Sequence, residues 1–323
     1  RVFFLQEALK SSGKRGGPIL SHVHVVGAGT MGGDIASWCA MAGLRVTIHD
    51  RDPDALARAT QRAWQLFRSR LKPKRLAERA MDRFIQDTSG SAAAGADIII
   101  EAIVEDADIK QAVFRELEKI ARPDAILATN TSSISLDAIA RKLKKPGRLV
   151  GLHFFNPVAK MQLIEVVYGH KTYKKYRQSA AAFCSQIGKL PVAVKSSPGF
   201  LVNRVLMPYT LEAVAILNDG VAAVDIDLAA TSFGMPMGPL ALADTVGLDI
   251  CLDVAENLAE TFHFEVPDLL REHVRKGRLG KKSGKGFYTW KNGKPVTAKP
   301  GHKTEYASKD QRVQQRLIFR YLN

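Results

Sequence analysis

The stretch HVHVVGAGTMG, at residues 22–32, decides the fold of this chain. It begins with a short run rich in valine, passes through glycines at positions 27, 29 and 32, and leads into residues whose apolar members recur at helical spacing. This order predicts a strand, a tight glycine turn and a helix. The same alternation of strand and helix continues on the C-terminal side.

The three glycines have separate physical roles in such a turn. Gly27 allows the turn to be tight, Gly29 lets the backbone approach a pyrophosphate, and Gly32 permits close packing of helix on strand. The first residues of the helix, Thr30 and Met31, offer free N–H groups and a partial positive charge to phosphates. The motif therefore predicts a dinucleotide site.

Asp50 ends the next strand, RVTIHD, and indicates which dinucleotide is preferred. An acid at this strand end hydrogen-bonds the adenine ribose 2′-hydroxyl and repels a 2′-phosphate. Asp50 therefore favours NAD as the cofactor, while the neighbouring Arg51 leaves NADP open. Asp50 is also suited to start the turn before Pro53, and the two roles are compatible.

Further runs of β-branched residues alternate with helical patterns along the chain. Strands are expected at 22–26, 45–49, 97–103, 125–129, 148–154, 163–167 and 191–194, and helices at 31–42, 53–71, 109–120 and 173–187. This βαβα order predicts an α/β fold, a Rossmann-type doubly wound and mostly parallel sheet.

The pattern changes after Gly199, where apolar residues recur at helical spacing and no strong strand run follows until 286–290. We expect an NAD-binding domain at 19–196 and an all-α C-terminal domain at 197–290. Residues 1–18 are interpreted as a helix and linker from a preceding domain. Residues 291–323 are interpreted as a linker and the start of a truncated second helical domain.

Composition limits the class of protein. Three cysteines without paired spacing indicate no disulfide framework and no CxxC metal site, and favour a reducing compartment. No apolar run reaches the roughly 20 residues of a membrane-spanning helix. The net charge of +15 leaves a nucleic-acid-binding module as one alternative, although solvated basic surfaces explain the charge as well.

Polar residues at strand ends are the candidates for catalysis. His153 closes one predicted strand and Glu165 lies in the next, so the two side chains are expected to meet. A carboxylate behind an imidazole fixes its tautomer and stabilises the imidazolium. Taken alone, a semi-buried structural histidine explains His153 equally well. Asn130 and Ser132 follow another strand, at the edge where open α/β sheets bind ligands.

Six motifs, GAGTMG, EAIVED, NTSS, GLHFFNPV, LIEVV and SPGFLVNRVL, resemble in order and spacing those of the L-3-hydroxyacyl-CoA dehydrogenases across about residues 22–290. The resemblance implies NAD-dependent oxidation of an L-3-hydroxyacyl-CoA to a 3-oxoacyl-CoA, as in fatty acid β-oxidation. It implies that His153 is the base and Glu165 its partner. Ser132 and Asn203 would hold the substrate oxygen near C3.

The resemblance also implies that Glu101 lies beside the nicotinamide end of the cofactor and that Asn130 belongs to the cofactor site. One stretch departs from the family pattern. Single-function relatives carry a serine and lysines near the CoA adenosine, whereas residues 63–71 here include Trp64 and Phe67.

Both ends of the chain resemble multifunctional fatty acid oxidation α-subunits of bacterial type. This resemblance implies a cytoplasmic location, with a eukaryotic organelle as the alternative. In those proteins an enoyl-CoA hydratase domain precedes the dehydrogenase, a second helical domain follows, and a thiolase subunit associates. The acyl-CoA would then be the substrate of this portion. A dehydrogenase of the same fold acting on a small hydroxy acid or sugar acid is the other alternative.

Overall fold

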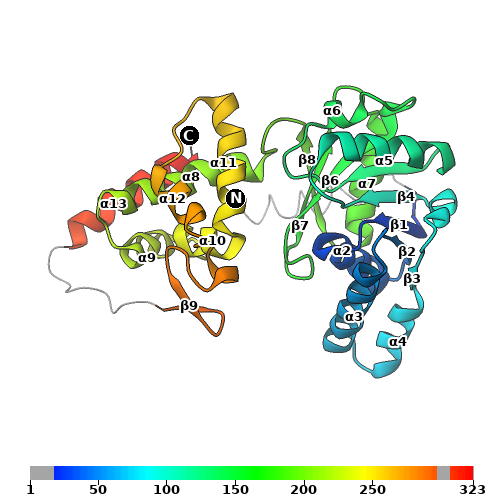
Figure 1. The fold of residues 1–323 in the computed structure, drawn as a ribbon, viewed down its shortest axis with the longest axis horizontal. Coiled ribbons are helices and arrows are strands. Elements are labelled where there is room, and N and C mark those ends of the chain that lie inside the picture. Colours follow the sequence, from blue (N-terminus) through cyan, green and yellow to red (C-terminus); the bar gives the residue numbers. More distant parts are fainter. Residues whose placement is uncertain (1–17, 297–305, 323) are drawn as a thin grey trace. The chain divides into compact units, whose positions relative to one another are not determined.

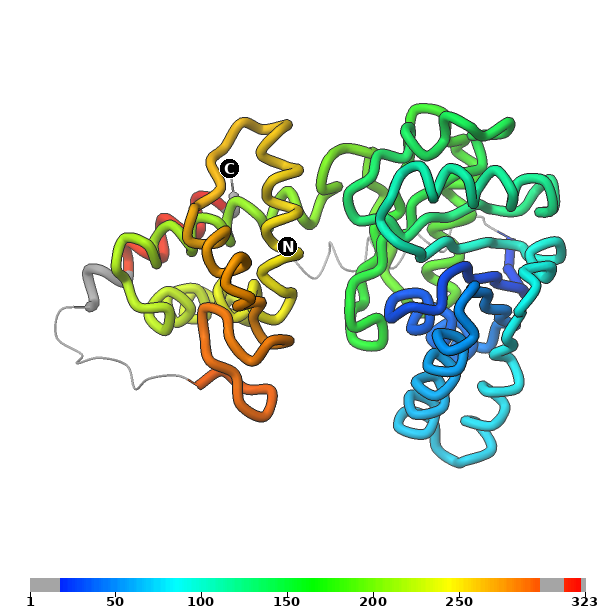
Figure 2. Tube along the Cα trace, viewed as in Figure 1, coloured from blue at the N-terminus to red at the C-terminus, as the bar shows by residue number. Residues whose placement is uncertain are grey.

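The computed structural model describes residues 18–296 and 306–322 of the chain. These form two compact units, one ending at Phe200 and the other beginning at Leu201. Figures 1 and 2 follow the chain through each of them. The expected leader helix lies outside the described residues.

The first unit is an eight-stranded sheet with helices on both faces. Its strands are β1 (His22–Val26), β2 (Arg45–His49), β3 (Phe84–Gln86), β4 (Ile98–Glu101), β5 (Ile126–Thr129), β6 (Leu149–Phe154), β7 (Leu163–Tyr168) and β8 (Leu190–Lys195). Their order is β3-β2-β1-β4-β5-β6-β7-β8, and every pair is parallel except β6–β7. The predicted doubly wound, mostly parallel sheet is thereby confirmed.

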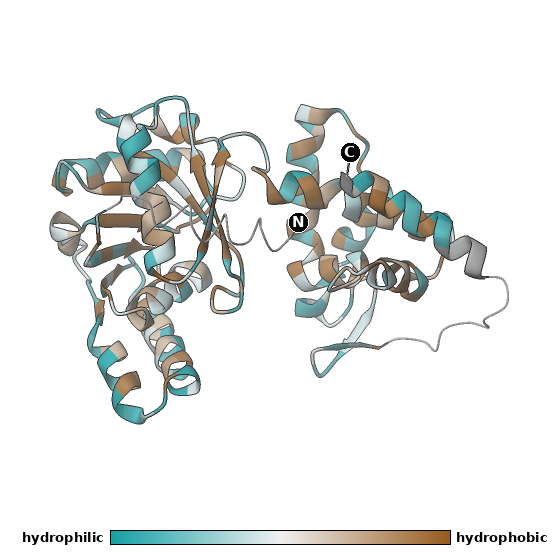
Figure 3. Ribbon diagram, turned by 180° about the vertical axis from the view of Figure 1, so that it is seen from behind, coloured by the Kyte–Doolittle hydropathy of each residue, from teal (hydrophilic) through white to brown (hydrophobic). Residues whose placement is uncertain are grey.

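The helices of this unit are α2 (Thr30–Met41), α3 (Pro53–Arg70), α4 (Lys74–Asp82), α5 (Ala107–Ile120), α6 (Leu136–Ala140) and α7 (Lys174–Gln186), with 3-10 turns η1 (Ser91–Gly95) and η2 (Pro146–Arg148). Side chains alternate across the sheet, so Val23 and Val25 pack with α2, α3 and α7. Ile99 and Leu127 pack with α5 and α6 on the other face. Figure 3 shows hydrophobic strands between these helix layers.

The second unit is built mainly from helices, as expected for residues after Gly199. They are α8 (Val202–Asn218), α9 (Ala223–Phe233), α10 (Pro239–Val246), α11 (Leu248–Phe262), α12 (Asp268–Arg275) and α13 (Tyr306–Leu322), with a 3-10 turn η3 (Lys281–Ser283). A two-stranded hairpin joins β9 (Thr289–Lys291) to β10 (Lys294–Val296). Residues 294–296, expected to be linker, thus form a strand.

Helix α13 packs within the second unit. Its Val313 and Leu317 are buried in the same core as α8 to α12. The sequence predicted a helix here but gave no information on what it packs against. Because α13 shares one core with α8 and α9, the described part of residues 291–323 belongs structurally to the second unit.

Candidate active site

The turn between β1 and α2 requires two of its glycines for steric reasons. Gly27 has φ +104°, and a Cβ there would lie 2.6 Å from the Ala102 carbonyl oxygen. A Cβ on Gly32 would lie 1.9 Å from the carbonyl oxygen of Gly27. Around Gly29, by contrast, no atom of the described residues comes within 4 Å of a Cβ, and the residue lines a large cavity.

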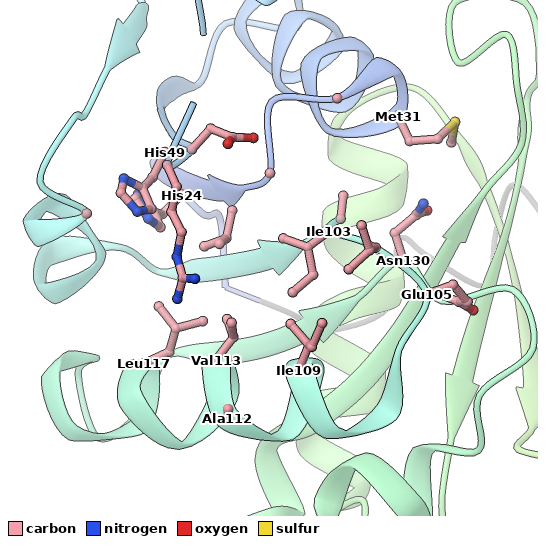
Figure 4. Close-up of a pocket in the computed structure, with 18 of the residues that line it drawn as sticks. His24, Met31, His49, Ile103, Glu105, Ile109, Ala112, Val113, Leu117 and Asn130 are labelled. Carbon is pink, nitrogen blue, oxygen red and sulfur yellow. The ribbon is translucent and has the colours of Figure 1, made fainter. Parts of the chain in front are cut away.

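This cavity, of about 1190 Å³, lies against the α5 face of the sheet. Figure 4 shows His24 and His49 together at one end, with Asn130 and Glu105 at the other. Thr30, Met31, Ser132 and His153 also line it. The cavity is therefore lined by His24 and His49 of β1 and β2, by the glycine turn, and by the predicted catalytic histidine, His153.

The start of α2 lies at the wall of this cavity, where Thr30 and Met31 line it. Gly29 precedes the helix without a side-chain cap, and the first turn carries no acidic residue. The free N–H groups and the helix dipole therefore face the cavity with partial positive charge. Phosphate groups fit this position.

His153, near the end of β6, is paired with Glu165 in the neighbouring strand β7. The antiparallel register of β6 and β7 puts the two residues directly opposite each other. His153 Nδ1 lies 2.6 Å from Glu165 Oε2. Glu165 is fully buried and His153 is 7% exposed, beside the ring of Phe155. Because Nδ1 is engaged, Nε2 is the ring nitrogen left for proton transfer in the cavity.

A carboxylate network holds the turn that follows β5. Glu105 Oε1 accepts hydrogen bonds from the backbone N–H of Ser132 at 2.9 Å and from Thr131 Oγ1 at 2.5 Å. Its Oε2 lies 3.2 Å from Lys110 Nζ. Burial alone would raise the pKa of Glu105, but the Lys110 ammonium and these hydrogen bonds outweigh it and lower the pKa. A stable carboxylate therefore fixes the position of Ser132.

Glu101 does not line the cavity, although it was expected beside the nicotinamide end of the cofactor. Its side chain is fully buried, accepts a hydrogen bond from Lys110 Nζ at 2.6 Å, and also binds Thr129 Oγ1 and the backbone N–H of Ile103. Glu105, four residues later, lines the cavity instead. The motif EAIVED contains both acids. Glu101 is the last residue of β4, and Glu105 lies in the loop before α5, where it reaches the cavity.

Asn130 connects the end of β5 to β6. Its Oδ1 accepts a hydrogen bond from the backbone N–H of Phe154 at 2.9 Å, so it ties the end of β5 to the residue after His153. Asn130, Ser132 and His153 all line the same cavity. The structure thus brings together three predicted site residues from two strands.

Two family sequence models match the chain in tandem. The 3-hydroxyacyl-CoA dehydrogenase NAD-binding domain matches residues 22–197, and the C-terminal domain of the same enzymes matches residues 199–290. The chain belongs to the 3-hydroxyacyl-CoA dehydrogenase family. Neither the sugar-acid nor the nucleic-acid alternative is favoured by these matches.

Relatives of this 3-hydroxyacyl-CoA dehydrogenase family member include longer proteins. The chain is 39% identical to the fatty acid oxidation complex subunit alpha of Pseudomonas putida strain GB-1, over 91% of this chain and 43% of that protein. It is 41% identical to the 3-hydroxyadipyl-CoA dehydrogenase of Escherichia coli K12, over 83% of this chain and 59% of that one. The chain thus spans less than half the length of the alpha subunits that it matches.

A solved structure agrees with the fold. The crystal structure of M. tuberculosis FadB2 has a TM-score of 0.82 and 36% identity, and the match covers 85% of this chain and 100% of that one. The family assignment makes NAD the cofactor of the first unit. No helix among residues 18–296 and 306–322 is both long and apolar enough to cross a membrane.

Asp50 holds two backbone turns at the end of β2. Its Oδ2 accepts a hydrogen bond from the backbone N–H of Ala28 at 2.6 Å, and its Oδ1 accepts one from Asp52 at 2.9 Å. Asp50 and Arg51 both line the cavity. Asp50 therefore braces the glycine turn and starts the turn before Pro53, and its contact with the adenine ribose of NAD stays a prediction.

Two other expectations concern residues outside the cavity. Asn203 is half-buried in the first turn of α8, in the second unit, and its role toward the substrate oxygen stays a prediction. In residues 63–71, Phe67 is buried against the sheet and Trp64 packs at the edge of the same core under Arg68. The departure from the family pattern thus has a packing role.

Proposed function

We propose that this chain oxidises the C3 hydroxyl of an L-3-hydroxyacyl-CoA with NAD and catalyses the reverse reduction. The observation that carries the proposal is a buried imidazole–carboxylate pair whose histidine lines the same cavity as a dinucleotide-binding glycine turn. Such a pair supplies the proton acceptor that alcohol oxidation requires. Bound NAD supplies the hydride acceptor.

The side chains divide the work of proton transfer. Glu165 accepts the Nδ1–H of His153 and so keeps Nε2 unprotonated in the resting state. As Nε2 takes the hydroxyl proton, the buried carboxylate 2.6 Å from Nδ1 stabilises the imidazolium. In the reverse direction the imidazolium returns the proton to the oxygen.

Positioning of the substrate oxygen falls to Ser132 and Asn203 in this proposal. Glu105 holds the backbone of Ser132, and Asn130 ties the adjacent turn to β6. These contacts keep the Ser132 hydroxyl at the cavity wall without using its oxygen for the anchor. Orientation of the reacting group accounts for a large part of enzymatic rate enhancement.

The test is reduction of acetoacetyl-CoA, followed through consumption of NADH. We expect His153→Gln to lower kcat by about 10²–10⁴-fold, the usual contribution of a positioned acid–base group. Glu165→Gln should also lower kcat, because an amide can donate to Nδ1 and favour the wrong tautomer. Both variants should bind NADH as the wild type does, since neither residue belongs to the glycine turn.

His170→Gln is the matched control. This histidine also pairs with a carboxylate, Asp137, at 2.7 Å, but its side chain is 73% exposed. Its replacement should leave turnover unchanged. Normal turnover after His153→Gln would exclude His153 as the base. Faster reduction of free acetoacetate than of the thioester would exclude an acyl-CoA substrate.

We also propose that the chain is the dehydrogenase portion of a larger cytoplasmic bacterial protein with an enoyl-CoA hydratase domain, which binds a thiolase subunit. The support is the match to bacterial alpha subunits of a fatty acid oxidation complex along 43% of their length. The natural protein should hydrate crotonyl-CoA and copurify with thiolase activity. A natural polypeptide of 35.4 kDa, the mass of this chain alone, would contradict the proposal.

A further inference from the structure

His24 is a buried histidine with an unsatisfied ring nitrogen. The residue lies in the middle of β1, has no solvent-exposed surface, and yet lines the NAD cavity. Its Nε2 has no hydrogen-bond partner among the described residues. A buried polar atom without a partner is destabilising. Nε2 is itself closed to solvent, so a ligand that shifts the cavity wall slightly and brings a donor against Nε2 would remove this cost.

Thr47 links His24 to a second histidine. The parallel register pairs His24 with Thr47, and both lie on the sheet face toward α5. Thr47 Oγ1 is 2.8 Å from His24 Nδ1 and 2.9 Å from His22 Nε2. A threonine hydroxyl has a single proton, so it can donate to one of these rings and must accept from the other.

His22 determines which way the chain of hydrogen bonds runs. Burial lowers the pKa of His22 and so keeps its ring neutral. A hydrogen bond to the backbone of Gly95 acts to raise the pKa, as expected when a ring N–H donates to a carbonyl oxygen. With its N–H on Gly95, His22 accepts the Thr47 proton at Nε2. Thr47 then accepts from His24 Nδ1–H, which leaves His24 Nε2 as an unprotonated acceptor.

The position of His24 in the cavity identifies the part of NAD that it meets. His24 and His49 lie at the end opposite Asn130 in Figure 4. Asn130 Oδ1 accepts a hydrogen bond from the backbone N–H of Phe154, next to His153, so the Asn130 end is also the His153 end. A dinucleotide with its nicotinamide near His153 and its adenosine ribose at Asp50 extends its base toward His24. The group facing Nε2 must be a hydrogen-bond donor, and the exocyclic amino group is the donor that adenine carries.

We propose that His24 Nε2 accepts a hydrogen bond from the amino group of the adenine base, so that His24 determines base specificity. Because Thr47 and His22 keep Nε2 unprotonated, Nε2 cannot donate to a base that carries a carbonyl oxygen in place of the amino group. Such a base should bind more weakly. Hypoxanthine is such a base, because its O6 is an acceptor. Two acceptors would then face each other in a buried site.

The test compares binding of NADH with binding of reduced nicotinamide hypoxanthine dinucleotide, measured on the whole chain by fluorescence titration without substrate. We expect the hypoxanthine form to bind at least about tenfold more weakly, which corresponds to ~1.4 kcal/mol. In His24→Val the two dissociation constants should become equal, mainly through weaker binding of NADH. Equal affinities in the wild type would overturn the proposal.

Two further variants separate recognition from general disturbance of the strand. Thr47→Val frees the His24 tautomer, because Nε2 can then carry the proton and donate to O6, and discrimination should fall. Val25→Ala removes buried volume from the opposite face of the same strand and should keep the wild-type ratio of dissociation constants. A ratio that survives in His24→Val, or one that collapses in Val25→Ala, would refute the assignment.

The tautomer can be measured independently of any cofactor. In ¹⁵N-histidine spectra of the unliganded protein, His24 should show a protonated Nδ1 and an unprotonated Nε2. A protonated Nε2 would remove the basis of the proposal. This measurement does not depend on the acyl substrate, so its outcome is separate from that of the dehydrogenase assignment.

Discussion

His24 also makes the stability of the first unit depend on pH. Burial lowers its pKa to about 4; the nearby Asp87 carboxylate acts to raise it, and His49 and His22 act to lower it. Between pH 6.5 and 4 the unfolded chain binds a proton that the folded state refuses, so stability falls as pH falls. From pH 8 to pH 5 this contributes a loss of about 2 kcal/mol.

Urea unfolding of the wild type and of His24→Val at these two pH values measures the effect. The variant lacks the group, so its free energy of unfolding should fall less on acidification, by about 2 kcal/mol. The remaining pH dependence, from carboxylates and from other histidines of lowered pKa such as His22 and His273, is common to both proteins. Identical pH dependence in the two would show that His24 is not held neutral by the fold.

Single residues also mark the limit of what the sequence could predict. Asp50, Asn130, Ser132 and His153 follow from their places at strand ends, where parallel strands bring ligand-binding groups together. His24 did not, because a histidine in mid-strand carries no local signal of function. It becomes conspicuous only when the register sets it beside Thr47 and the cavity.

At the scale of the element, two glycines of the β1–α2 turn have different roles: Gly29 matters for cofactor binding, and Gly32 also matters for stability. Gly29 has φ −59°, which alanine tolerates, and the space around its Cβ position is open. Gly29→Ala should therefore fold as stably as the wild type, while its methyl group stands where the pyrophosphate approaches and weakens NADH binding at least about tenfold. Gly32→Ala should both lower the stability and weaken NADH binding, because its Cβ would lie 1.9 Å from a backbone oxygen of the turn.

Thermal unfolding and NADH titration of the two variants check this contrast. We expect Gly32→Ala to lose roughly 1–3 kcal/mol of stability, as overpacked positions do, and Gly29→Ala to lose none from sterics. Wild-type NADH affinity in Gly29→Ala would mean that the cofactor does not approach this part of the turn.

The elements that sequence patterns predicted are those with long or strongly alternating signals. The strands at 22–26 and 45–49 and the helix at 53–71 were identified within a residue or two. Strand β3 was missed because Phe84–Gln86 is a three-residue edge strand, too short for a period to show. The antiparallel sense of β7 was also undetermined, since composition does not distinguish the two directions when both faces are buried.

At the scale of the whole molecule, each unit has a hydrophobic core of its own. In the second unit, Asp244 is fully buried and accepts hydrogen bonds from the backbone N–H groups of Phe287 and Tyr288 and from Trp290 Nε1. The carboxylate thereby fastens the segment before β9 to α10. The sequence did not indicate this role, because the donors lie more than 40 residues away.

Asp244→Asn should therefore destabilise the second unit selectively. An amide cannot accept at both ends, so at least one buried N–H loses its partner, at a cost of about 1–3 kcal/mol. Phe67→Ala is the reciprocal variant, since Phe67 is fully buried in the first unit and its truncation costs about 3–5 kcal/mol.

Scanning calorimetry with and without NADH distinguishes the units, because a ligand raises the transition of the unit that binds it. Asp244→Asn should lower the temperature of the transition that NADH leaves unchanged. Phe67→Ala should lower the temperature of the transition that NADH raises. NADH affinity measured at 25 °C, well below both transitions, should stay normal in Asp244→Asn, since the cavity is built from the first unit. If Asp244→Asn instead lowered the NADH-sensitive transition and left the other unchanged, the assignment of one core to each unit would be wrong.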